Sequence, residues 1–127
     1  MKKVPRIMVC VTRQKTCERL IKIGKEIAYK TEGEILVVHV AKEGANFLDN
    51  PHQGEALEYL FQISKTVGAD MSVLRSDNVV NTLVEFAKKN AVSIIIVGES
   101  PYARKNDNIT RELERLLPNV KIMVVEA

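Results

Sequence analysis

Five short apolar runs, rich in Val and Ile, constrain the fold of this chain more than any other feature of its sequence. Several runs are nearly continuous rather than alternating, as is typical of strands that are covered on both faces in a parallel sheet. The four segments between the runs carry apolar residues at helical spacing. This alternation predicts a doubly wound, three-layer α/β sandwich with a five-stranded parallel sheet. The predicted strands are residues 6–11, 34–40, 70–74, 92–97 and 120–125.

Local signals give the expected ends of the helices. Thr16 is predicted to cap the first helix, and Ser76 or Asp77 the third, because hydroxyl and carboxylate side chains accept the free N–H groups of a helix start. Phe61 falls on the apolar stripe of the second helix and is expected in the core. The run at residues 70–74 is the most mixed of the five, which predicts an edge strand.

Size and composition narrow the classes of function. The 127 residues suffice for one domain, residues 1–127, and the mixture of 46% hydrophobic and 28% charged residues excludes a disordered chain. The net charge of +3 comes from the first fifteen residues, which hold no acid, so a broad nucleic-acid-binding face is not expected.

The sequence shows no pattern typical of a membrane span or a signal peptide. The longest apolar runs are far below the roughly 20 residues that span a bilayer, so no membrane insertion is expected. The N-terminus lacks the apolar stretch of a signal peptide, which predicts a cytoplasmic protein. The chain begins with Met and ends just past the fifth predicted strand, so a free-standing domain is expected.

Three loops follow predicted strands and therefore meet at the carboxyl edge of the sheet. They comprise residues 12–15, 41–51 and 98–108. Open α/β sheets bind ligands at this edge, in the crevice where the strand order reverses. We therefore expect the functional site there.

The first of these loops reads Thr12, Arg13, Gln14, Lys15 and opens the first helix. Two cations, hydroxyl groups and the free N–H groups of a helix start suit a phosphate. The alternative is a solvated turn in which Thr16 only caps the helix. Because the chain contains neither G-x-G-x-x-G nor G-x-x-x-x-G-K-[ST], the common dinucleotide and P-loop sites are excluded.

The loop after the fourth predicted strand offers a second set of polar residues. Gly98 at the strand end would let backbone approach a ligand closely. Ser100, Arg104 and Lys105 could hold its polar groups. An ordinary polar surface loop is the alternative interpretation.

Catalytic and metal-binding patterns are not evident. His39 and His52 have no partners at metal-ligand spacing, so a core and a surface position are expected, respectively. Cys10 is expected to be a buried, inert thiol, and Cys17 could have a lowered pKa in a first helical turn. Glu99 follows the fourth predicted strand, but the pattern places no second carboxylate beside it for general acid–base catalysis. We therefore expect no enzyme and no metal centre.

Five stretches, taken in order, resemble universal stress protein domains over nearly the whole chain. They are residues 6–11, 17–21, 35–40, 83–87 and 94–98. Within that family the chain looks most like the stress-protein domain of Kdp-type potassium-sensor histidine kinases. There too a Cys-Val-Thr/Ser opening, a Glu-Arg-Leu-Ile helix and a Gly-x-Ser ending to the fourth strand are typical.

The resemblance implies a nucleotide-binding-like fold with strand order 3-2-1-4-5. It also implies a cytoplasmic homodimer through the last strand, from Val120 to Val125. In the family, adenine lies near the end of the second strand, so Val38 and Val40 would line its pocket. The residues that would meet phosphates are Arg13, Lys15, Arg104 and Lys105.

The ATP-binding pattern of the family is incomplete in this chain. Thr12 stands where ATP-binding members carry an acid. In their pattern G-x2-G-x9-G-[ST], Gly98 matches the first glycine, but Pro101 takes the second place, and Arg111 falls at or near the third. Gly98 is the last glycine of the chain, so the three-glycine phosphate loop is absent.

The resulting expectation is a non-catalytic signalling or sensor domain. It would respond to a small anionic or adenine-containing ligand without the usual ATP-binding loop, with a sensor kinase or transporter as partner. One alternative is a protein-interaction and dimerisation module with no ligand. Another is an enzyme related to adenine-nucleotide hydrolases or transferases on the same fold.

Overall fold

The structure is a computed structural model that describes residues 4–12, 14–98 and 103–126, with side chains except those of residues 14, 15, 49 and 103–108. Strands and helices alternate along the chain as the sequence pattern predicts. The elements are β1 (Arg6–Cys10), α1 (Gln14–Thr31), β2 (Glu34–Ala41), the 3-10 turn η1 (Phe47–Asp49), α2 (Gln53–Thr66), β3 (Asp70–Arg75), α3 (Val79–Lys89), β4 (Ile94–Gly98), α4 (Ala103–Leu116) and β5 (Lys121–Val125).

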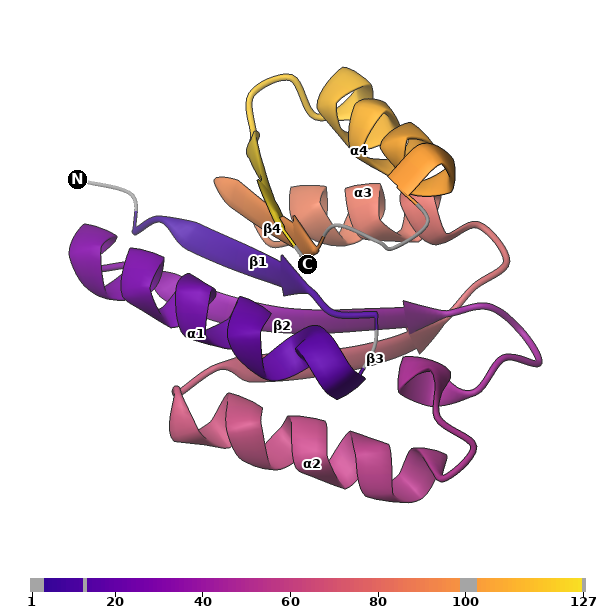
Figure 1. Cartoon of the computed structure of the whole chain (residues 1–127). Coiled ribbons are helices and arrows are strands. Elements are labelled where there is room, and N and C mark those ends of the chain that lie inside the picture. The colour runs from indigo at the N-terminus through magenta and orange to yellow at the C-terminus, as the bar shows by residue number, and fades with distance from the viewer. Residues whose placement is uncertain (1–3, 13, 99–102, 127) are drawn as a thin grey trace.

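The five strands form one parallel sheet in the order β3-β2-β1-β4-β5. This confirms the predicted doubly wound sandwich, its strand order and the edge position of β3. Helices α1 and α2 cover one face of the sheet, and α3 and α4 cover the other (Figure 1). Within the described ranges, no helix combines the length and apolar character needed to cross a bilayer.

Each face of the sheet carries its own core. On central strand β1, Ile7 and Val9 pack toward α1 and α2, whereas Met8 and Cys10 pack toward α3 and α4. Ile7, Met8 and Val9 have no exposed surface. Burial on both faces explains why the run is continuous in sequence rather than alternating.

Helix α1 approaches the sheet closely at Gly24. A Cβ atom at this position would lie 2.6 Å from Val9 Cγ2 and 3.0 Å from Ile35 Cδ1. Both distances are shorter than ordinary carbon–carbon contacts of about 3.5–4.0 Å. Glycine is therefore required here by packing, although it is a poor helix former.

Two helix caps differ from the sequence prediction. Thr16 lies inside α1, which begins two residues earlier. Asn78 caps α3, because its side chain accepts the N–H three residues further on. The prediction of Ser76 or Asp77 as the cap is wrong: the Ser76 hydroxyl instead accepts the N–H of Asn78 and donates to its carbonyl oxygen. Asn, Ser and Asp are about equally good N-cap residues, so residue type alone does not identify which of the three caps the helix.

Two further expectations need correction. Helix α4 begins at Ala103, so the loop after β4 is shorter than the predicted residues 98–108. Phe61 is half-exposed on the outer side of α2, whose buried residues are Ala56, Leu60 and Ser64. The apolar stripe of α2 is therefore narrower and turned away from Phe61.

Candidate functional site

The carboxyl edge of the sheet brings together two helix starts. Strand β1 is followed by α1 and strand β4 by α4, and β1 and β4 are neighbours at the point where the strand order reverses. In Figure 1 this edge lies on the right-hand side, where β2 ends and α1 begins. The free N–H groups of helix starts carry partial positive charge, so the two starts together favour an anion.

The predicted ligand residues fall at this edge as far as the structure describes them. Thr12 is exposed two residues after β1, and Gly98 is exposed at the end of β4. Gln14 and Lys15 begin α1, and Arg104 and Lys105 lie in the first turn of α4. Arg13 and Ser100 lie outside the described residues, as do the side chains of Gln14, Lys15, Arg104 and Lys105. Their contacts with a phosphate stay a prediction.

Gly98 has a packing role as well as a predicted ligand role. A Cβ atom there would lie 3.3 Å from Leu20 Cδ1 of α1. Glycine thus allows α1 to sit close to the end of β4. The close approach of a ligand is not needed to explain this glycine.

The two valines assigned to an adenine pocket differ in burial. Val38 has no exposed surface and belongs to the core beneath α3 and α4. Val40 is only partly buried. Of this pair, Val40 is the one that offers side-chain surface to a base.

His39 is buried, as predicted, and both of its ring nitrogens are hydrogen-bonded. Its Nδ1 lies 2.8 Å from the Val11 carbonyl oxygen, and its Nε2 lies 2.9 Å from the Leu48 nitrogen. Because the Leu48 N–H can only donate, Nε2 must accept, and Nδ1 must carry the proton. Burial lowers the pKa of His39, and the nearby Arg75 charge lowers that pKa further, against the effect of the Val11 carbonyl. The ring is therefore neutral.

The loop from residue 42 to 52, here called the β2–α2 loop, is held by Arg75 at the end of β3. Arg75 Nη1 donates to the carbonyl oxygens of Lys42 and Ala45, at 3.1 and 2.8 Å. The guanidinium carbon lies 4.0 Å from the centre of the Phe47 ring, a cation–π distance. Gln53 Oε1 accepts the Phe47 N–H at 3.1 Å. The loop is therefore ordered by side chains that come from the strand and helix beside it.

Leu48 in this loop adopts a left-handed backbone conformation, with φ 56° and ψ 25°. Such a conformation is strained for a branched residue and persists only when its surroundings impose it. Two interactions impose it: the Leu48 side chain is packed in the core, where the residue is 2% exposed, and the Leu48 N–H donates a hydrogen bond to His39. The strain is thus stored beside the candidate ligand edge.

The cysteines give no support for a nucleophile. Burial raises the pKa of Cys10 to about 12 and that of Cys17 to about 11. The lowered pKa that a first helical turn could give Cys17 is not found, because the effect of burial on the pKa outweighs that of the helix start. His52 is exposed, as predicted. Among the residues that the structure describes, no three His, Cys, Asp or Glu side chains gather into a metal site.

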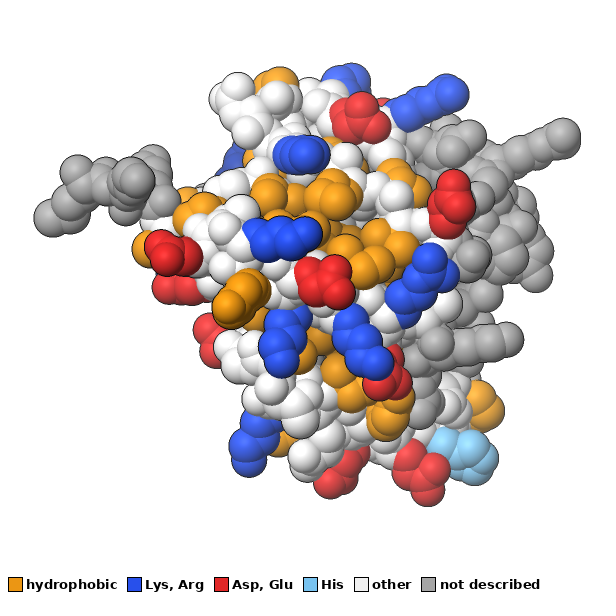
Figure 2. Space-filling model, turned by 60° about the vertical axis from the view of Figure 1, so that its left-hand side comes forward, with side chains coloured by type: hydrophobic (Ala, Val, Ile, Leu, Met, Phe, Trp, Pro, Cys, Tyr) orange, Lys and Arg blue, Asp and Glu red, His pale blue; other side chains and the backbone are white. Residues whose placement is uncertain are grey.

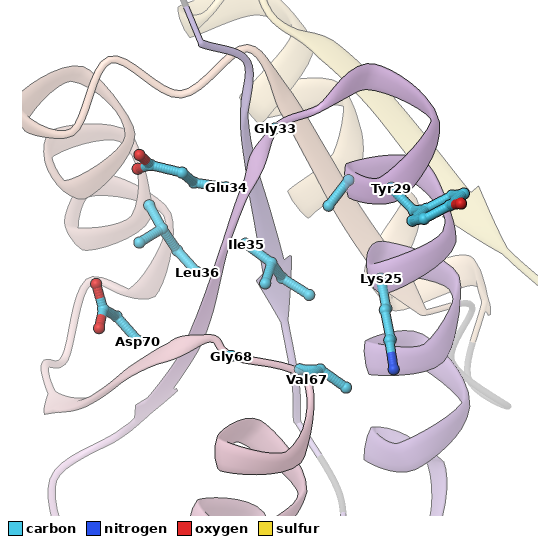
Figure 3. A pocket seen from close by; sticks show the side chains of 10 residues that line it. Lys25, Tyr29, Gly33, Glu34, Ile35, Leu36, Val67, Gly68 and Asp70 are labelled. Carbon is cyan, nitrogen blue, oxygen red and sulfur yellow. The ribbon is translucent and has the colours of Figure 1, made fainter.

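A surface pocket of about 490 Å³ lies at the opposite, amino edge of the sheet. Lys25 and the largely exposed Tyr29 extend from α1 on one side of Ile35, and Glu34 and Asp70 lie on the other side (Figure 3). The face toward this edge carries hydrophobic surface interspersed with charges of both signs (Figure 2). This mixture favours no single class of ligand.

Comparison with solved structures identifies the fold. Universal stress protein UspA from Lactobacillus plantarum superposes with a TM-score of 0.72 at 13% identity, covering 98% of this chain and 99% of that chain. A universal stress protein in complex with cAMP gives a TM-score of 0.65 at 12% identity, with 98% of each chain covered. The chain has the fold of the universal stress proteins. The Archaeoglobus fulgidus universal stress protein in complex with dAMP shares this fold, with a TM-score of 0.60, 17% identity and 98% of each chain covered.

Sequence comparison finds similarity to a short part of a sensor protein. The chain is 30% identical over 100 residues to the sensor protein KdpD of Mycobacterium tuberculosis. The match covers 78% of this chain but only 11% of the length of KdpD. No family model matches. The predicted resemblance to universal stress proteins and to a Kdp sensor is thus confirmed by structural neighbours and by this sequence match.

Proposed function

We propose that this chain is a non-catalytic signalling domain that binds a small adenine nucleotide at the carboxyl edge of its sheet. The observation that carries the proposal is the pair of helix starts, of α1 and α4, flanking the crossover between β1 and β4. Two solved structures of the same fold are described as complexes with cAMP and dAMP. An adenosine monophosphate or cyclic monophosphate is the ligand class that fits this support.

A triphosphate is disfavoured by the chemistry of the segment after β4. Backbone N–H groups of glycine-rich turns cradle polyphosphates, because no side chain crowds the anion. Gly98 is the last glycine of the chain, and Pro101 has no N–H to donate. A single phosphate needs only the helix starts and a few cations.

Titration calorimetry with AMP, cAMP and ATP tests the proposal. We expect heat with AMP or cAMP and weaker binding of ATP. Replacing both Arg104 and Lys105 by Ala should weaken the binding of AMP by at least about tenfold, because hydrogen bonds to charged groups contribute about 1.5–3 kcal/mol. The matched control replaces Lys88 and Lys89 at the end of α3, which removes the same charge at the other edge of the sheet. Absence of heat with all three nucleotides would reject the proposal.

Absence of turnover is part of the same proposal. Neither cysteine thiol is activated as a nucleophile, since burial raises the pKa of both. Incubation with ATP and AMP should release no inorganic phosphate above the buffer blank. Release that scales with protein concentration would instead support the enzyme alternative.

The output of such a domain would be contact with another protein. The similarity to part of KdpD supports a sensor kinase as that partner. We also propose a homodimer through β5, an edge strand on which Val124 is 50% exposed. Light scattering should give twice the monomer mass, and Val124→Glu should give the monomer. A dimer that gives no nucleotide heat would favour the interaction-module alternative.

A further inference from the structure

The ring of His39 lies between Val11, just after β1, and the β2–α2 loop. One ring nitrogen binds the Val11 carbonyl, which immediately precedes the predicted ligand loop at Thr12. The other accepts the N–H of Leu48 in the β2–α2 loop. The side chain is 3% exposed, so water does not substitute for either partner. One residue thus fixes two chain segments that are far apart in sequence.

We propose that His39 is a positioning residue that holds the chain at Val11, just after β1, and the β2–α2 loop against each other, and that losing its Nε2 acceptor releases the Leu48 segment of that loop. The inference rests on the proposed function in one respect, that the crevice bordered by these segments is the nucleotide site. The release itself is a property of the fold and is measured without nucleotide.

Release follows from the chemistry at Leu48. Its N–H can bond Nε2 only while that nitrogen has a free lone pair, so protonation of the ring and this hydrogen bond exclude each other. Without the bond, the left-handed backbone of Leu48 keeps only its side-chain packing as support. A buried N–H would then face another N–H. Leu48 is therefore the residue that moves, while Phe47 beside it stays held by Gln53 and Arg75.

The groups around the ring set the direction of the pH dependence. Arg75, from β3, is the charged neighbour and opposes a second positive charge. From η1, the Phe47 ring meets the imidazole edge at 5.8 Å. From α1, Cys17 belongs to the same core cluster as Leu48 and stays neutral, because burial raises its pKa to about 11. Burial and Arg75 both favour the neutral ring, so uptake of a proton is linked to release, and acid below the ordinary histidine pKa of about 6.5 favours the released state.

Two variants separate the two ring nitrogens. His39→Asn keeps a short amide donor near the position of Nδ1 and removes the acceptor for Leu48. His39→Gln carries its amide oxygen further out, near the position of Nε2, and retains that acceptor. His52→Gln is the matched control, because His52 is exposed at the start of α2. It removes the other histidine of the chain.

Amide hydrogen exchange measured by NMR on the full chain tests the release directly. In wild type and in His52→Gln, the protection factor of the Leu48 amide should fall about tenfold or more between about pH 7.5 and pH 5, the factor expected for one lost buried hydrogen bond. In His39→Asn it should be low and independent of pH. In His39→Gln it should be near the neutral wild-type value and also independent of pH. A tautomer assignment from ring ¹⁵N shifts should place the proton on Nδ1.

AMP titrations on the same samples show whether the loop matters for binding. We expect the affinity of wild type to fall in acid in step with Leu48 protection, and the affinity of His39→Gln to stay constant. Leu48 protection that is the same in wild type and His39→Asn, or that stays constant in acid, would overturn the inference. If AMP binds to none of the proteins at any pH, the nucleotide function fails, and Leu48 exchange alone still decides the role of His39. If His39→Asn does not fold, the wild-type profile against His39→Gln gives the same decision.

Discussion

Replacement of Gly24 by Ala should destabilise the protein even though Ala is the better helix former. An added Cβ would lie 2.6 Å from Val9 Cγ2 and 3.0 Å from Ile35 Cδ1. Val9 has no exposed surface and Ile35 only 6%, and both lie on strands paired in the centre of the sheet. Neither side chain has room to withdraw, so α1 would have to move outward.

The magnitude follows from two opposing effects. Ala in place of Gly favours a helix by about 1 kcal/mol. Overpacking of a well-packed core costs about 1–3 kcal/mol. Gly24→Ala should therefore lower the free energy of unfolding by about 1 kcal/mol.

Gly54 in α2 provides a matched control for this substitution. A Cβ atom there has no heavy atom within 4 Å, so Gly54→Ala gains helix propensity without a clash. It should raise the free energy of unfolding by about 0.4–1 kcal/mol. The two variants should thus differ by close to 2 kcal/mol.

Urea denaturation followed by circular dichroism measures this difference. With a slope of about 2 kcal/mol per molar urea, the two midpoints should lie about 1 M apart, with Gly24→Ala the lower. Val9→Ala removes the methyl that the clash meets, so it should cost less in the Gly24→Ala background than in wild type. Equal midpoints for the two alanine variants would refute the close-packing reasoning.

Three shorter predictions concern the site and the core. The pKa of His39 is lower in the folded than in the unfolded chain, so the unfolded chain binds more protons in mild acid, and the free energy of unfolding should fall as pH drops below about 6.5. Urea midpoints measured across pH should show a shallower fall in His39→Gln. Cys10 and Cys17 should not react with a thiol reagent at pH 8 in the native protein and should react fully in urea, since burial raises their pKa values to about 12 and about 11. Arg75→Lys should lose the hydrogen bonds to the two carbonyl oxygens and the contact with the Phe47 ring, and so destabilise the protein by about 1–2 kcal/mol. Protease cleavage in the β2–α2 loop should become faster, and unchanged cleavage would contradict the role assigned to Arg75.

The sheet could be predicted from sequence because its physical cause is local. Residues 7–11 and 94–97 are continuous apolar runs, as is typical of strands buried on both faces. The strand order needed the family resemblance, since the pattern of runs does not say which strands are neighbours. The start of α3 could not be predicted to the residue, because Ser76, Asp77 and Asn78 are consecutive and all three have side chains that cap helices.

The interactions that hold the candidate site could not be read from the sequence. His39 binds main-chain atoms of residues 28 and 9 positions away in the sequence. Since nearly all residues carry the same main-chain groups, the sequence does not indicate which of them a side chain will bind. Arg75 ends an edge strand, where a solvated arginine is the ordinary expectation, yet it bonds carbonyls 33 and 30 residues away. The burial of His39 was predictable from its place in an apolar run, but its two partners required the folded chain.

Under the proposed signalling function, burial of both cysteines limits the kinds of signal that the domain would detect. Oxidants attack the thiolate form of cysteine, and sulfenic acid or mixed disulfides form where that form is populated and accessible. Cys10 and Cys17 are buried, and their raised pKa values leave almost no thiolate near neutral pH. Peroxide or disulfide exchange should therefore leave the native sulfur chemistry of these two residues unchanged. Under the proposed function, the signal would therefore be ligand binding or proton uptake rather than oxidation of the two thiols.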